Sequence, residues 1–276
     1  MRLRFTKMHG LGNDFVMVDA ISQRVAITPE RARQLADRHF GVGCDQVLVV
    51  EAPQNPDADF SYRIFNHDGS EVENCGNGAR CFAIFVRQRH LTTKTIINAE
   101  TRGGMLQLHV HPDDSVTVDM GAPRLTPAEI PFVAPSEAPS YRLQLNQQEL
   151  EIGAVSMGNP HAVTLVDNLD AYPVAEVGAE VECHSRFPNR VNAGFMQIIN
   201  RNQIHLRVFE RGVGETIACG TGACAAMVSG VQRGLLDNQV SVNLPGGQLQ
   251  IEWDGPGKPV KMTGPATTVF HGQIKI

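Results

Sequence analysis

The chain has 276 residues, of which 42% are hydrophobic and 19% charged, and its formal net charge is −5. These values are typical of a soluble globular protein with about two domains. The sequence contains no block of like charges, so neither a nucleic-acid groove nor a polybasic membrane patch is expected. The longest aliphatic runs are too short to span a bilayer. The N-terminus lacks the apolar segment of a secretory signal, so we expect a cytoplasmic protein.

The first part of the chain combines short apolar runs with two helical patterns. Strands are expected at 15–18, 47–50 and 62–65. A helix is expected over 29–38, because Thr28 can cap it and Pro29 suits its first position. A second helix is expected over 76–88, and it should be buried because it has few polar residues on any face.

The rest of the chain shows similar elements after a proline-rich stretch. Strands are expected at 116–120, 163–166 and 205–209. The stretch from Pro123 to Pro139 is interpreted as a linker or loop. Another apolar helix is expected over 220–232, and the tail after Pro265 is expected to form one extra strand.

An internal repeat relates the two apolar helices. The sequence CGNGA that starts at Cys75 matches CGTGA that starts at Cys219. An arginine, a phenylalanine and a glutamate precede both cysteines at equal spacings; these residues are Arg63, Phe65 and Glu71 in one half and Arg207, Phe209 and Glu215 in the other. We expect an α+β protein of two pseudo-symmetric halves, each with mostly antiparallel strands wrapped around a central helix. The predicted halves are 1–121 and 122–264, and the last strand, 265–276, extends the first half; the alternative is two unrelated domains with glycine-rich turns.

Each cysteine of the repeat precedes Gly-x-Gly at the start of a buried helix. Such a helix start binds anions, and it lowers the pKa of a thiol from its usual value of about 8.5. Glycines there would let the backbone approach a ligand closely. Two such helix starts could hold one carboxylate, with a thiol on either side of the α-carbon, as a racemase requires. We therefore predict that Cys75 and Cys219 form an acid–base pair, whereas Cys81 and Cys224 are expected to be buried packing residues.

The halves differ at one informative place. Asn66-His67 follows the repeated phenylalanine in the first half, and Glu210-Arg211 follows it in the second. Arginine can hold a carboxylate bidentately and glutamate can pair with an ammonium group, so this pair predicts a ligand contact. The alternative is an ordinary surface ion pair.

Other chemistries find less support in the sequence. The segment from Gly220 to Ala225 resembles a dinucleotide fingerprint, but the long helices and parallel strands of a nucleotide-binding fold are missing around it. The ten histidines lack metal-ligand spacing, and the six cysteines include no C-x-x-C. We expect no metal and no cofactor.

Five segments carry a family resemblance. They are MHGLGNDFVMVD at 8–19, GVGCDQ at 41–46, FNHDGSEVENCGNGARC at 65–81, MGNPHAV at 157–163 and FERGVGETIACGTGACA at 209–225. The chain resembles diaminopimelate epimerases over essentially its whole length. The resemblance implies two similar α+β halves, a C-terminal strand that returns to the first half, and cofactor-independent interconversion of L,L- and meso-diaminopimelate in lysine and peptidoglycan precursor synthesis.

The resemblance also implies roles for individual residues. Cys75 and Cys219 correspond to the catalytic pair, and His161 and Glu210 to residues that support catalysis. The carboxylate cradle would be Gly76, Asn77, Gly220 and Thr221. The remaining expected substrate contacts are Asn13, Gln46, Asn66, Asn159, Asn192, Glu210 and Arg211. A homodimer is implied, with Phe270 at its interface.

Three alternatives remain open. A proline racemase shares the two-cysteine logic, but its substrate has a single carboxylate and would leave Arg211 unexplained. An isomerase with a carboxylate base would not need both cysteines. A protein of a different class, a thiol redox or binding protein, would not catalyse epimerisation at all.

Overall fold

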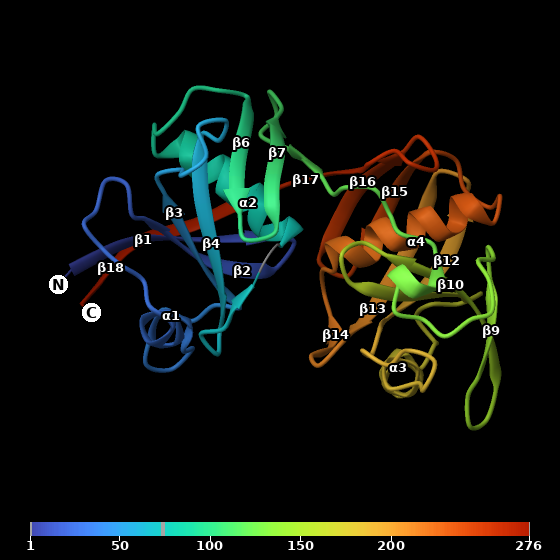
Figure 1. Ribbon diagram of the computed structural model, residues 1–276. Helices are drawn as coiled ribbons and strands as arrows, with labels where there is room; N and C mark the ends of the chain where they lie inside the picture. Colours follow the sequence, from blue (N-terminus) through green and yellow to red (C-terminus); the bar gives the residue numbers. More distant parts are fainter. Residues whose placement is uncertain (1, 73–74, 276) are drawn as a thin grey trace. The chain divides into compact units, whose positions relative to one another are not determined.

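The computed structural model describes residues 2–72 and 75–275 of a chain that divides into two compact units. Unit 1 extends to Asp119 and resumes at Thr263, and unit 2 comprises Met120–Met262. Both units combine strands with few helices, so the α+β prediction is confirmed (Figure 1). No helix in the described part of the chain is long and apolar enough to cross a membrane.

Unit 1 contains two helices among its strands. Its elements are β1 (Arg2–Gly10), β2 (Asn13–Asp19), α1 (Pro29–Ala36), β3 (Gln46–Glu51), β4 (Phe60–Asn66), β5 (Glu71–Val72), α2 (Gly76–Gln88), β6 (Ile96–Thr101), β7 (Gly104–Val110), β8 (Val116–Asp119) and β18 (Thr267–Lys275). The strands pair in the order β18-β1-β2-β3-β4-β6-β7-β8, with β5 also on β4. All pairs are antiparallel except β2–β3 and β4–β6. The last strand therefore returns to the first, as the resemblance implied.

Unit 2 repeats this arrangement. Its elements are η1 (Pro127–Glu129), β9 (Tyr141–Gln144), β10 (Glu149–Ser156), β11 (Pro160–Leu165), α3 (Val174–Glu182), β12 (Asn192–Asn200), β13 (Gln203–Glu210), β14 (Gly214–Thr216), α4 (Gly220–Gln232), β15 (Gln239–Leu244), β16 (Gly247–Trp253) and β17 (Val260–Gly264), the last of which ends in unit 1. The order β9-β10-β11-β12-β13-β15-β16 is antiparallel except at β11–β12 and β13–β15. The parallel pairs thus fall at corresponding places in the two units.

The central helices are buried, as their composition predicted. In unit 1, α2 contacts β1, β2, β3, β7 and β8, and its residues from Gly76 to Val86 are all buried. In unit 2, α4 contacts strands from β10 to β16. Both helices have the bounds expected from the sequence, because each mainly apolar segment lies between Gly-x-Gly and a Gln-Arg pair.

A second helix packs on the opposite face of the strands in each unit. In unit 1, Val16 and Val18 of β2 belong to a core cluster with Ala32 and Leu35 of α1, whereas the alternate residues of β2 face the other way. In unit 2, α3 takes the corresponding position, with Val174, Val177 and Val181 in a core cluster. A strand with helices on both faces of its sheet buries nearly all its side chains, so its sequence is almost wholly apolar. This explains the aliphatic run at Val47–Val50.

The repeated arginines and glutamates have a structural role. Arg63 donates Nε and Nη2 to the two carboxylate oxygens of Glu71, at 2.9 Å each. Arg207 makes the same bidentate pair with Glu215, at 2.6 and 2.9 Å. Each pair joins a long strand to the short strand that leads to the cysteine helix, so the repeat preserves this connection.

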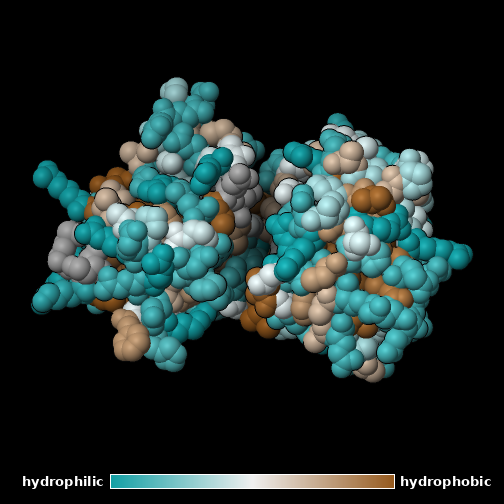
Figure 2. Space-filling view, turned by 60° about the horizontal axis from the view of Figure 1, so that its bottom comes forward, coloured by the Kyte–Doolittle hydropathy of each residue, from teal (hydrophilic) through white to brown (hydrophobic). Residues whose placement is uncertain are grey.

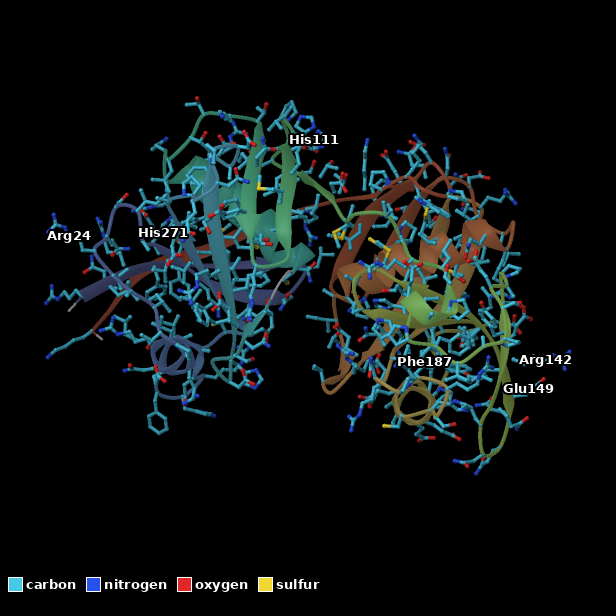
Figure 3. The ribbon with its side chains drawn as sticks, viewed as in Figure 1. Arg24, His111, Arg142, Glu149, Phe187 and His271 are labelled. Carbon is cyan, nitrogen blue, oxygen red and sulfur yellow. The ribbon has the colours of Figure 1, made fainter. Side chains whose placement is uncertain are left out.

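The surface that Figure 2 presents is largely hydrophilic on each unit, with small apolar areas scattered among the hydrophilic residues. Charged pairs stabilise some exposed turns; Arg142 and Glu149 form an ion pair of 3.2 Å across the β9–β10 hairpin (Figure 3). Such exposed pairs contribute little stability, about 0–1 kcal/mol.

Candidate active site

Each unit contains a half-site at the start of its central helix. In unit 1, Cys75 is the N-cap residue of α2, and its sulfur accepts a hydrogen bond from the Gly78 N–H at 3.4 Å. In unit 2, Cys219 is the N-cap residue of α4. The repeat therefore places both cysteines in the position that the sequence predicted.

The topology explains why polar residues gather at this end of unit 1. Strands β2 and β3 are parallel and begin at Asn13 and Gln46, and β4 runs back to end at Asn66. All three residues therefore lie at one edge of the sheet, and α2 begins close by, because Asn13 Oδ1 lies 3.8 Å from Cys75 Sγ. The same side chain accepts a hydrogen bond of 3.3 Å from Asn77 Nδ2.

Gln46 offers an unused acceptor in this half-site. Its Nε2 donates to Asn66 Oδ1 at 2.9 Å, and the registered pairing of β3 with β4 places the two residues opposite each other. Its Oε1 is buried and has no hydrogen-bond partner among the described residues. A buried acceptor without a partner is unfavourable, so an ammonium group is a suitable partner for it.

The half-site of unit 2 is more deeply buried. Cys219 is 4% exposed, and its sulfur lies 3.7 Å from Thr221 Oγ1. Thr221 in turn accepts a hydrogen bond of 3.3 Å from Asn159 Nδ2. Asn159 precedes β11 as Asn13 begins β2, and both follow a glycine, Gly158 and Gly12, so corresponding Gly-Asn segments reach the helix starts of the two units.

The pKa of Cys219 runs against the sequence expectation. Burial raises it well above the usual value for a thiol, and the nearby carboxylate of Glu210 raises it further. The Gly222 N–H and Thr221 act in the opposite direction, as a helix start should, but they do not outweigh burial and the negative charge. The prediction of a lowered thiol pKa is therefore wrong for Cys219, because burial and Glu210 favour its protonated form.

His161 is enclosed in the protein beside Asn159. Its Nε2 lies 3.1 Å from Asn159 Oδ1, while its Nδ1 is buried without a hydrogen-bond partner among the described residues. Burial lowers the His161 pKa to about 3, and the positive charge of Arg211 contributes to the shift. The imidazole is therefore neutral at physiological pH.

The Glu210-Arg211 pair lies where β13 ends. Glu210 is half-buried and accepts a hydrogen bond from the Thr216 hydroxyl. The Arg211 side chain is exposed and donates Nη1 to the Asn189 carbonyl at 3.0 Å. Glu210 thus lies beside the thiol of Cys219, and the guanidinium of Arg211 keeps donors available for a carboxylate.

Asn192 serves the protein itself. It is buried, its Oδ1 accepts the Arg211 N–H at 2.9 Å, and its Nδ2 donates to the Pro160 carbonyl at 3.1 Å. It therefore holds the backbone of Arg211 against β11. Its expected contact with a substrate stays a prediction.

The expected carboxylate cradle consists of the first two residues of each helix. Gly76 and Asn77 begin α2, and Gly220 and Thr221 begin α4, where backbone N–H groups point out of a helix. The second glycine of each motif has another role. A Cβ on Gly78 would lie 3.1 Å from Leu48, and one on Gly222 would lie 3.0 Å from Val208, so these glycines allow strands to pack against the helix start. Their expected close approach to a ligand stays a prediction.

Sequence reasoning missed several supporting residues. Glu182 at the end of α3 is buried, and it accepts the Gly212 N–H at 2.7 Å, which fixes the turn after Arg211. Thr216 orients Glu210, and Asp45 accepts a hydrogen bond from Asn13. Asp45 belongs to the segment GVGCDQ, so its place in that motif was the available signal.

No cluster of three or more histidine, cysteine, aspartate or glutamate residues suited to a metal ion occurs among residues 2–72 and 75–275. The half-sites instead offer thiols, amides, the Glu210 carboxylate and helix N–H groups. Such groups can move a proton and hold a carboxylate or an ammonium group.

Solved structures with this fold cover nearly the whole chain. A PhzF-family phenazine biosynthesis protein from Bacillus anthracis matches 100% of both chains with a TM-score of 0.72 and 20% identity. A hydroxyproline epimerase from Agrobacterium vitis matches 99% of this chain and 92% of its own, with a TM-score of 0.71 and 15% identity. The protein thus falls in the fold class that includes PhzF proteins and proline-type racemases and epimerases.

Sequence comparison narrows the class. The family model described as diaminopimelate epimerase matches residues 5–126 and 153–269. Proteins named diaminopimelate epimerase from Teredinibacter turnerae and Pseudomonas aeruginosa are 72% and 58% identical to this chain, each over the full length of both sequences. The chain belongs to the diaminopimelate epimerase family.

Proposed function

We propose that this protein interconverts L,L- and meso-diaminopimelate, with Cys75 and Cys219 as the two acid–base groups. Membership of the family makes it an isomerase, and its product serves lysine and peptidoglycan precursor synthesis. The observation that carries the mechanism is the repeated device itself: a cysteine that caps the central helix in each unit.

The proton transfers follow from the opposed roles of the two thiols. A cysteine thiolate removes the α-proton, and the electron pair of the broken C–H bond moves onto the α-carboxylate. The other cysteine, as a thiol, then gives its proton to the opposite face of the α-carbon. Afterwards the first cysteine is a thiol and the second a thiolate, so the reverse reaction uses the same groups in exchanged roles.

The pKa of Cys219 favours one starting arrangement. Burial and Glu210 keep its proton on the sulfur, so Cys219 is suited to act as the acid for a substrate whose proton Cys75 removes. In the reverse reaction Cys219 must act as a thiolate, and an ammonium group bound by Glu210 would offset the negative charge that now disfavours this state.

The helix starts stabilise the charge that develops on the carboxylate. Backbone N–H groups of Gly76, Asn77, Gly220 and Thr221 are the proposed donors. Preorganised donors of this kind are worth about 2.7–4 kcal/mol each in the transition state. Neutral His161 holds Asn159, and Asn159 holds Thr221, so these residues support the second helix start.

The distal amino-acid centre needs contacts that differ between the halves. We assign Arg211 to its carboxylate, and Gln46 with the asparagine set to its remaining polar groups. Gln46 Oε1, which has no hydrogen-bond partner within residues 2–72 and 75–275, supports this assignment, because it provides a buried acceptor for an ammonium group. A proline racemase, the nearest alternative, would leave these groups without a partner.

An assay with purified protein tests the proposal. After prolonged dialysis against a chelator, the protein is incubated with L,L-diaminopimelate, and the stereoisomers are separated by chiral chromatography. We expect meso-diaminopimelate to accumulate without added metal or cofactor. Turnover of proline instead would favour a proline racemase, and absence of any epimerisation would favour a thiol redox or binding protein.

We also propose that the protein is cytoplasmic, since an isomerase that forms a precursor acts where its substrate is made. We further propose that it is a homodimer. The strand pair β18–β1 supports the dimer, because two large apolar side chains of β18 are exposed. Val269 is 55% exposed and Phe270 is 46% exposed. Phe270 also packs edge-on against Phe5 of β1, at 5.9 Å between ring centroids. Light scattering should report a dimer that Phe270→Asp dissociates, whereas Phe40→Asp at a 90% exposed position should leave it intact.

A further inference from the structure

A charged cluster lies directly beside Asn13 in unit 1. Arg38 donates to both carboxylate oxygens of Asp14, at 2.9 and 3.2 Å, and to Asp45 Oδ1 at 2.8 Å. Lys7 donates to Asp14 at 2.5 Å and to the Gly43 carbonyl. These contacts hold the pKa of Asp14 at about 2 despite its burial, so Asp14 is ionised at neutral pH.

The second oxygen of Asp45 reaches toward the half-site. Asp45 Oδ2 accepts hydrogen bonds from Asn13 Nδ2 at 2.9 Å and from the Asp14 N–H at 3.1 Å. A carboxylate accepts hydrogen bonds and cannot donate them. If the side-chain amide of Asn13 were flipped, its oxygen would face this carboxylate and the two acceptors would repel each other. Asp45 therefore permits only one orientation of the Asn13 amide.

Asn77 fixes the other end of the same amide. Arg80 Nη2 donates to Asn77 Oδ1 at 2.9 Å, and a guanidinium can only donate. Asn77 must therefore turn its Nδ2 toward Asn13, where it donates to Oδ1 at 3.3 Å. The Asn13 carbonyl oxygen is thus directed to the side where Cys75 Sγ lies, 3.8 Å away.

We infer that Asp45 is a positioning residue: its carboxylate fixes the Asn13 amide so that the carbonyl oxygen, and not the NH₂ group, faces the Cys75 thiol. The inference rests on the proposed catalytic role of Cys75. The Asn13 oxygen accepts the thiol proton and so favours the protonated state, whereas the Gly78 N–H favours the thiolate. Asp45 therefore shifts this balance toward the thiol.

Two buried neighbours of Cys75, Tyr62 and Cys81, do not obscure such an effect. Tyr62 and Cys81 interact electrostatically with Cys75, but burial raises the pKa of both groups, that of Cys81 to about 12. Both stay neutral in the pH range where Cys75 is titrated. The charge of Asp45 itself also disfavours a thiolate, so the experiment must separate charge from orientation.

The pH dependence of Cys75 alkylation by iodoacetamide, measured on the full-length protein by peptide mapping, provides the test. Asp45→Ala frees the Asn13 amide, so we expect the apparent pKa of Cys75 to fall by about half a unit or more. Asn13→Ala should lower it as well, and in the Asn13→Ala background Asp45→Ala should add a distinctly smaller shift, because only the effect of the Asp45 charge is left there. Asp113→Ala, which removes an exposed carboxylate of the β7–β8 turn, is the charge-matched control and should leave the pKa unchanged.

Two results would overturn the inference. One is an unchanged Cys75 pKa in Asp45→Ala; the other is an equal shift with and without Asn13, which would mean that Asp45 acts through its charge alone. Should Asp45→Ala fail to fold, Asp45→Asn provides the same test, because an amide can donate as well as accept and permits both orientations of Asn13; an unchanged pKa there overturns the inference too. Alkylation requires no turnover, so these results are independent of whether the wild type epimerises diaminopimelate.

Discussion

The thiol of Cys219 lies against the carboxylate of Glu210, which raises the pKa of a cysteine already deprived of solvent. A helix start would by itself favour the thiolate, but a buried sulfur beside a negative charge keeps its proton. In the second half-site, the Cys219 thiol is therefore suited to donate a proton.

The pH dependence of Cys219 alkylation tests this arrangement. Because its pKa is raised, Cys219 should react slowly through neutral pH and gain reactivity only above the usual titration range of a thiol. Glu210→Gln removes the negative charge but keeps the shape, so the pKa should fall and alkylation at pH 8 should accelerate several-fold. An equal reactivity of Cys219 in Glu210→Gln and the wild type would show that the carboxylate does not control the thiol. Glu215→Gln, which alters an ion-paired carboxylate on β14, is the matched control.

His161 should make the protein sensitive to acid. Its pKa is about 3 in the folded state and near 6.5 when solvated, so the unfolded chain takes up a proton that the folded chain does not. The stability associated with neutral His161 is present above pH 6.5 and is lost as the pH falls toward 3. Urea unfolding at pH 7 and pH 5 should show a smaller loss for His161→Asn than for the wild type. The exposed His205→Asn should behave like the wild type, and an identical loss in all three proteins would rule out this contribution.

The four helix cysteines should separate into two classes. Cys75→Ala and Cys219→Ala should each abolish epimerisation, because each removes one of the two proton carriers. Cys81→Ala and Cys224→Ala alter fully buried side chains and should cost about 1 kcal/mol of stability with activity largely retained. Initial rates and urea unfolding of the four variants measure both effects. Full activity in either of the first two variants would remove that cysteine from the mechanism.

The bounds of the central helices could be predicted because a local pattern specifies them. α3 was not predicted, because its N-cap residue is Pro173, which makes no side-chain capping bond. The local sign of this helix was the helical spacing of three valines that are buried in the structure, Val174, Val177 and Val181. The first helix ends at Ala36 instead of Arg38, where the chain turns at Asp37. β11 begins at Pro160, ahead of the expected Val163, since proline is tolerated at the first position of a strand.

The site was predictable to the level of residue type and repeat position. The grouping of Asn13, Gln46 and Asn66 depends on the parallel pairing of β2 with β3, which no local pattern specifies. The raised pKa of Cys219 depends on burial and on Glu210, both of which are tertiary features. Asp45 and Glu182 likewise act through contacts between distant segments, so neither role could be derived from the sequence alone.

Substrate selection should depend on Arg211. Diaminopimelate has a distal carboxylate and lysine does not, so a site built to bind that group should discriminate against lysine by about 10⁴-fold. Arg211→Met should lower kcat/KM for diaminopimelate by a factor of at least one hundred. Arg186→Met, which alters an arginine stacked on Phe132, serves as the control. Comparable turnover of lysine, or a near-normal kcat/KM in Arg211→Met, would show that Arg211 does not read the distal centre.

The central claim, that two cysteines act on opposite faces of one carbon, is tested most directly by solvent deuterium. Wild-type protein is incubated with L,L-diaminopimelate in heavy water, and the two stereoisomers are separated at low conversion. Mass spectrometry then measures the deuterium content of each. The proton that leaves stays on one thiol while the other thiol delivers deuterium, so label should appear in meso-diaminopimelate and scarcely in the recovered L,L-isomer. Equal early labelling of both isomers would mean that a single base exchanges the proton, and would contradict the two-cysteine mechanism.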